Sequence, residues 1–105
     1  MILYDRHEPP RSVEVSASQR IHRGPALIVS LSVSGDGAAA LGVVYDGGNA
    51  SGVRKATLQC ESDASFSPNI RGGIECLTGI HVTVDASTTF VRVEYYPGAE
   101  VEDRK

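Results

Sequence analysis

Histidines and serines are the first residues to consider, because a serine activated by a histidine base can act as a nucleophile. The three histidines are His7, His22 and His81, and serines are abundant. The histidines fall in three different kinds of predicted segment: an N-terminal arm, a turn and the face of a strand. No Gly-x-Ser-x-Gly motif accompanies them. Surface histidines are the better interpretation, so we expect no catalytic residues and no enzyme.

Carboxylates come next, since paired carboxylates do acid–base work and clustered ones bind metal ions. Several aspartates fall in or beside predicted turns: Asp36, Asp46, Asp63 and Asp85. Aspartate favours turns because its side chain bonds to nearby backbone amides. Neither the turn at 35–37 nor the loop at 46–52 has the dense Asp/Asn spacing of a calcium site. We therefore expect no metal and no cofactor.

Cys60 and Cys76 are the only cysteines, and their spacing matches no zinc motif. The N-terminus shows no apolar signal segment, so we expect synthesis in a cytoplasm, where disulfides are rare. We interpret both cysteines as small core residues. A disulfide formed after release into an oxidising environment remains the alternative.

The elements that would position any site are predicted to be strands. Two alternating runs between Leu27 and Tyr45 flank a Gly35-Asp36-Gly37 turn, which predicts a β-hairpin. We expect one shared face on each strand: Leu27, Val29, Leu31 and Val33 on the first, with Ile28 on its other face, and Leu41, Val43 and Tyr45 on the second.

Further alternating runs lie at 12–19, 53–60, 64–67, 74–76, 80–84 and 90–96. In the last run we expect Val91, Val93 and Tyr95 to face inward. About eight short antiparallel strands, with turn signals about every ten residues, predict an all-β single domain, a β-sandwich or jelly-roll-like fold, at 12–97. An N-terminal arm at 1–11 precedes it and a charged C-terminal tail at 98–105 follows, because Pro97-Gly98 is expected to end the last strand.

Composition excludes several classes of partner. The chain has 105 residues and a formal net charge of −3, with its lysines and arginines scattered. A nucleic-acid-binding domain would normally show a basic patch, and a membrane-spanning helix needs a longer apolar stretch than any here. We expect no nucleic acid and no membrane partner. A 41% hydrophobic content without tryptophan makes a lean core, which favours oligomerisation.

Short motifs follow one another in a particular order across residues 26–96. They are Gly35-Asp36-Gly37 after the strand from Leu27, Val44-Tyr45-Asp46-Gly47, Ala50-Ser51-Gly52, Ala56-Thr57-Leu58, Ile74-Glu75-Cys76-Leu77-Thr78-Gly79-Ile80-His81-Val82 and Val91-Arg92-Val93-Glu94-Tyr95. Their order and spacing resemble those of small virion proteins of tailed bacteriophages, of the capsid decoration (cement) type.

The resemblance implies a β-sandwich or jelly-roll subunit on the outside of a phage head, made in the host cytoplasm. It implies a homotrimer that binds the major capsid protein lattice, stabilises the head, and has neither catalytic residues nor a small-molecule substrate. The alternative is a receptor- or carbohydrate-binding β-sandwich domain of a phage tail fibre. Its site would use the tyrosine-rich last strand and the glycine-rich loops.

Contact residues are chosen by their chemistry, since aromatic residues and arginine are enriched at interfaces. For the capsid or partner contact we expect the arm residues Ile2, Leu3, Tyr4 and Arg6. For the contact between subunits we expect Phe90, Arg92 and Tyr96 on the outer face of the last strand.

Overall fold

The computed structural model describes residues 2–4 and 7–100, and this part of the chain is all-β. Its strands are β1 (Ile2–Tyr4), β2 (Arg11–Val15), β3 (Gln19–Arg23), β4 (Ala26–Gly35), β5 (Ala40–Asp46), β6 (Val53–Cys60), β7 (Ser65–Phe66), β8 (Ile74–Cys76), β9 (Gly79–Val84) and β10 (Thr89–Glu100). Ten strands replace the expected eight or so among these residues, because the arm forms a strand and because the 12–19 run ends early in β2, with the additional strand β3 beginning at its last residue.

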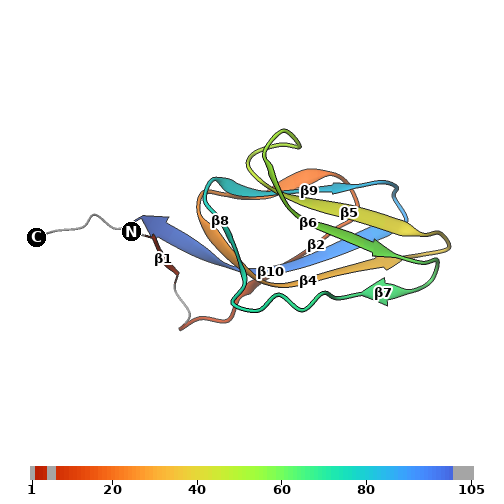
Figure 1. Ribbon diagram of the computed structural model, residues 1–105, viewed down its shortest axis with the longest axis horizontal. Helices are drawn as coiled ribbons and strands as arrows, with labels where there is room; N and C mark the ends of the chain where they lie inside the picture. Colours follow the sequence, from red (N-terminus) through yellow and green to blue (C-terminus); the bar gives the residue numbers. More distant parts are fainter. Residues whose placement is uncertain (1, 5–6, 101–105) are drawn as a thin grey trace, which may run out of the picture.

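The strands form two antiparallel sheets, as a β-sandwich requires (Figure 1). In the first sheet β10 lies between β4 on one side and β1 and β2 on the other. The outer edge of β4 pairs with β8 and β7. The second sheet has the order β3-β9-β5-β6.

The core lies between the two sheets and is built from the inward residues of each alternating strand. Its fully buried side chains include Ile28, Leu31, Val33, Val44, Leu58, Ile80, Val82, Val91 and Val93. Burying each such side chain stabilises the fold by about 1.5–3 kcal/mol. At Gly42 the sheets approach so closely that a Cβ there would lie 2.6 Å from Cγ2 of Val91.

The predicted hairpin between β4 and β5 is wrong. The two strands belong to different sheets, and the segment 36–39 carries the chain from one to the other. This connection is tight, since a Cβ on Gly35 would lie 2.3 Å from the carbonyl oxygen of Ala38. The amides of Gly35 and Asp36 bond instead to the carbonyls of Ala64 and Thr88.

The predicted faces of β4 need correction too. In β4 the register shifts at Val29, which is bulged out of the pairing with β10. The bulge changes the alternation, so Ile28 rather than Leu27 or Val29 joins Leu31 in the core cluster, although Leu27 is also buried. In β5 the expected residues share a face as predicted; their neighbours Ala40 and Val44, on the other face, belong to the core between the sheets, and Val43 is also buried.

The last strand continues beyond its expected end at Pro97-Gly98. Gly98 donates its N–H to the carbonyl of Pro25 at 2.8 Å, on the β4 side of β10. Because successive N–H groups along a strand point to opposite edges, the nitrogen of Pro97 faces the other edge. At that edge the pairing of β10 with β2 extends only as far as Tyr95. Pro97, which has no N–H, therefore costs β10 no hydrogen bond. Residues 101–105 of the expected tail lie outside the described residues.

Candidate functional site

The two ends of the chain pair with each other. Ile2, Leu3 and Tyr4 lie opposite Glu100, Ala99 and Gly98 in an antiparallel register. The pair forms a two-stranded ribbon that projects from one end of the sandwich, at the left of Figure 1. We call residues 2–4 and 98–100 the terminal ribbon. The expected arm therefore docks on its own subunit, through residues that were expected to belong to the tail.

Gly98 is the position where the terminal ribbon closes. A Cβ there would lie 2.7 Å from Cε1 of Tyr4 and 2.9 Å from Cγ2 of Ile2. The glycine is required for space, because its φ is not among those in the left-handed region. Ile2 and Tyr4 are half-buried, whereas Leu3 is 51% exposed and points away from this contact.

Tyr4 also ties the terminal ribbon to β8. Its hydroxyl donates a hydrogen bond to the Glu75 carboxylate at 2.6 Å. Burial, followed by this hydrogen bond to an acceptor that carries negative charge, raises the pKa of Tyr4. The phenol therefore stays protonated near neutral pH, where it can keep donating this bond.

The two groups of predicted contact residues meet on one face of β10. Phe90, Arg92 and Tyr96 alternate along that face, and Gly98, with Tyr4 opposite it, occupies the next such position. Arg92 is exposed, and its Nε donates to Oγ of Ser12 at 3.0 Å. Arg6, also a predicted contact residue, lies outside the described residues.

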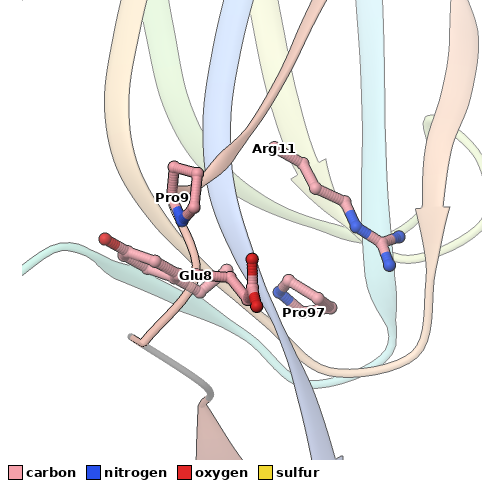
Figure 2. A pocket seen from close by; sticks show the side chains of 5 residues that line it. Glu8, Pro9, Arg11 and Pro97 are labelled. Atoms are coloured by element: carbon pink, nitrogen blue, oxygen red, sulfur yellow. The ribbon is translucent and has the colours of Figure 1, made fainter.

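An open pocket of about 370 Å³ lies at the base of the terminal ribbon. It is lined by Glu8, Pro9, Arg11, Tyr96 and Pro97. Figure 2 shows the rings of Pro9 and Pro97 with the Glu8 carboxyl group between them in this view, and the Arg11 guanidinium to one side. Two proline rings and a tyrosine give apolar walls, and the two charged groups could orient a polar chain segment.

Asp46, one of the turn aspartates, has a structural role. Its carboxylate accepts hydrogen bonds from the backbone N–H groups of Leu77 at 2.9 Å, Thr78 at 2.8 Å and Gly79 at 3.3 Å. Burial of Asp46 acts to raise its pKa, but these amides together with Lys55 outweigh it and hold the pKa below the ordinary value. We call this arrangement the amide clasp; it joins the end of β5 to the start of β9.

Asp85 is likewise engaged by its surroundings. It accepts hydrogen bonds from the Thr89 hydroxyl and, at 3.2 Å, from the Leu41 amide. The Thr89 hydrogen bond is the main cause that lowers the pKa of Asp85. Within residues 2–4 and 7–100, no three His, Cys, Asp or Glu residues gather as metal ligands would.

Both cysteines are free thiols, and they pack as small core residues. Cys76 belongs to the core, where burial raises its pKa to about 11. Cys60 packs against the core and lies with Sγ 3.3 Å from the carbonyl oxygen of Ala64. The described residues contain no helix long and apolar enough to cross a membrane.

Sequence reasoning missed the residues that complete the ribbon. Glu75 gave no signal, because its contact with Tyr4 joins residues 71 positions apart. Pro97 and Gly98 were interpreted as a strand end, although a proline is compatible with a strand edge that has no partner. The lining of the pocket combines residues from the arm and β10, so only the fold brings it together.

Comparisons with protein-family models, with curated proteins and with solved structures found no match to this chain. The chain is thus defined by its own structure, as a small two-sheet all-β protein with paired ends.

Proposed function

We propose that this chain is a structural virion protein that decorates and stabilises a phage head by binding the major capsid protein. The observation that carries the proposal is the terminal ribbon, a projecting element made from residues 2–4 and 98–100, with the exposed Leu3 at its middle pair. An attachment protein needs such a contact surface and no reaction centre.

The ribbon suits attachment to an extended segment of a partner. A strand at a sheet edge offers unpaired N–H and C=O groups, which an incoming strand can use by β-addition. Here β1 is the outer strand of the ribbon, and Leu3 adds exposed apolar surface beside that edge. The neighbouring pocket, with its proline and tyrosine walls, offers such a partner a second contact.

Trimer formation belongs to the same proposal, with Phe90 and Arg92 at the contact between subunits. Both lie on the outer face of the first sheet, where the serines of β4 and Ser12 and Glu14 of β2 surround them. Three attachment ribbons on one trimer would bind a repeating lattice far more tightly than one ribbon. This avidity would let a small contact per subunit hold a head together.

The test uses the capsid protein encoded in the same genome as this chain. Shells assembled from that protein are mixed with the purified chain and pelleted through a sucrose cushion, and light scattering gives the chain's mass in solution. We expect a trimer that pellets with shells. Leu3→Ser should weaken pelleting about tenfold or more, whereas Leu77→Ser, at a leucine 54% exposed on a loop, should not.

Failure to pellet with shells, or a genome without a capsid protein, would contradict the proposal. Equal pelleting of the two leucine variants would contradict the role given to the ribbon. A monomer, both free and on shells, would contradict the trimer.

A further inference from the structure

One transverse row of side chains crosses all four strands of the second sheet. Arg20 of β3 pairs with His81 of β9, His81 with Tyr45 of β5, and Tyr45 with Arg54 of β6. The rings of Tyr45 and His81 lie 6.3 Å apart between centroids, and Cζ of Arg54 lies 6.0 Å from the Tyr45 ring centroid. We call these four residues the cationic row. They lie on the outer face, opposite the core.

Both edge strands are bulged at this row. In β6 the register shifts between Val44 and Tyr45, which leaves Lys55 as an extra residue beside Arg54. In β3 it shifts between Arg20 and His22. Bulges re-aim side chains and are frequent next to binding sites. Two of them flanking one row indicate that the placement of the arginines is a specific feature of this sheet.

The carboxylates nearest the cationic row are Asp46 and Asp85, and both accept hydrogen bonds from backbone amides. The next row on this face holds Thr83, Val43 and Thr57. The row after it holds Leu41 and Gln59, with Asp85 opposite Leu41. Asp46, the nearest aspartate along the chain, is held by backbone amides in the amide clasp. Neither Arg20 nor Arg54 is paired with a carboxylate in the part of the chain that the structure describes. Within the described residues this face thus holds two arginines without a carboxylate partner, although the chain has a net charge of −3.

The charge of the row comes from the arginines. His81 is half-buried, and its burial, together with the neighbouring Arg20, lowers its pKa, so the imidazole is neutral near pH 7. The arginines stand at opposite edges of the sheet, about 14 Å apart at three strand spacings. Between them lie two aromatic rings and, in the next row, two threonine hydroxyls.

We propose that the cationic row binds an acidic polysaccharide, a chain of sugar rings that carry carboxylates. Arginine recognises carboxylates through paired hydrogen bonds, and tyrosine and histidine side chains with threonine hydroxyls suit the mixed apolar and polar surface of a sugar. An open sheet face accommodates a long chain. Duplex DNA carries a charge about every 1.7 Å, far denser than two arginines about 14 Å apart can match.

The glycine-rich loop 47–52 forms one side of this surface. A Cβ on Gly48 would lie 3.3 Å from Nη1 of Arg20, so the bare backbone lets the guanidinium lie against the loop. In Figure 1 this loop, between β5 and β6, rises above the sandwich. The proposal does not depend on a capsid role, because the row is separate from the terminal ribbon.

Titration calorimetry and affinity electrophoresis with polygalacturonate at physiological salt test the proposal. Dextran serves as the neutral polymer and duplex DNA as the denser polyanion. Arg20→Gln and Arg54→Gln should each weaken polygalacturonate binding about tenfold, the effect of losing one charge-assisted hydrogen bond. Arg71→Gln is the matched control, an exposed arginine on a loop outside the row.

The expected result is binding to polygalacturonate, none to dextran, weaker binding to DNA, and no effect of the control substitution. All three arginines are exposed, so the variants should unfold at the wild-type temperature. No binding to polygalacturonate would overturn the proposal. Equal weakening by Arg71→Gln would also overturn it, because the loss of binding would then follow from the net charge of the protein rather than from the row. DNA binding as tight as polysaccharide binding would overturn it as well.

Discussion

Replacing Gly98 by alanine should detach the terminal ribbon without unfolding the sandwich. The added Cβ would lie 2.7 Å from Cε1 of Tyr4 and 2.9 Å from Cγ2 of Ile2, both far inside normal contact. Tyr4 can relieve the contact only by moving its ring, which breaks the 2.6 Å hydrogen bond to Glu75. The strain therefore falls on the pairing of β1 with β10.

The size of the effect follows from two opposing terms. Overpacking by one methyl group costs about 1–3 kcal/mol. Replacing a glycine where alanine can adopt the backbone returns about 0.4–1 kcal/mol, because the unpaired chain has less freedom. The middle of these ranges leaves about 1.3 kcal/mol against the paired ribbon. That corresponds to roughly a tenfold larger population of the detached state.

Native-state hydrogen exchange followed by NMR measures this population directly. We expect the ribbon amides that are protected by pairing with β10 to exchange about tenfold faster in Gly98→Ala, with core amides such as Val93 and the unfolding temperature unchanged. Ala99→Ser, an exposed neighbour on the other face of the ribbon, is the control and should leave exchange unchanged. Unaltered exchange in Gly98→Ala would refute the steric argument. Equal acceleration in the core would show that the ribbon is not an independent unit.

Two further predictions concern the core and the amide clasp. Asp46→Asn replaces one acceptor oxygen by an NH₂ group that faces a backbone N–H, so urea unfolding at pH 7 should show a loss of about 1.5–3 kcal/mol. The folded pKa of Asp46 is depressed, so this contribution is complete above the ordinary value of 3.8 and is lost as the pH falls through the folded pKa. The gap between variant and wild type should therefore narrow in acid, and a gap independent of pH would contradict the ionised clasp. With a thiol reagent at neutral pH, buried Cys76 (pKa about 11) should react only on unfolding, whereas partly exposed Cys60 should react in the folded protein; modification of both thiols at equal rates would contradict the core placement of Cys76.

Alternation along the chain predicted most strands, because each buries one face. The run at 53–60 became β6 with the predicted ends, and the inward residues of β10 were predicted correctly. Alternation does not say which sheet a strand joins. The 35–37 turn looks like a hairpin, yet the connection it opens joins the two layers. Alternation also gives the wrong faces at a bulge such as Val29, where one extra residue exchanges the inward and outward positions of the strand.

The candidate sites were only partly predictable, and for a related reason. Tyr4 and Tyr96 were chosen from their chemistry, but their convergence depends on Gly98 lying in a strand that was expected to have ended. The cationic row had no signal in the spacing of the sequence. Arg20 and His81 are 61 positions apart, and only the register of β3 with β9 makes them neighbours. The residues of a cross-strand site are brought together by strand pairing, so no local sequence motif predicts them.

One series of backbone contacts runs from the amide clasp, beside the cationic row, to the terminal ribbon. Substitutions at its two ends can test whether the two proposed surfaces are independent. The amide clasp holds residues 77–79 against β5, the carbonyl of Thr78 accepts from the Gly24 amide at 2.8 Å, and the next residue, Pro25, accepts from Gly98 at the base of the ribbon. Asp46→Asn acts at the start of this series of contacts and should weaken ribbon protection. Gly98→Ala acts at its end and should affect the ribbon alone. If Gly98→Ala also weakened polysaccharide binding, the row and the ribbon would form one surface, and the proposal that they are separate would be wrong.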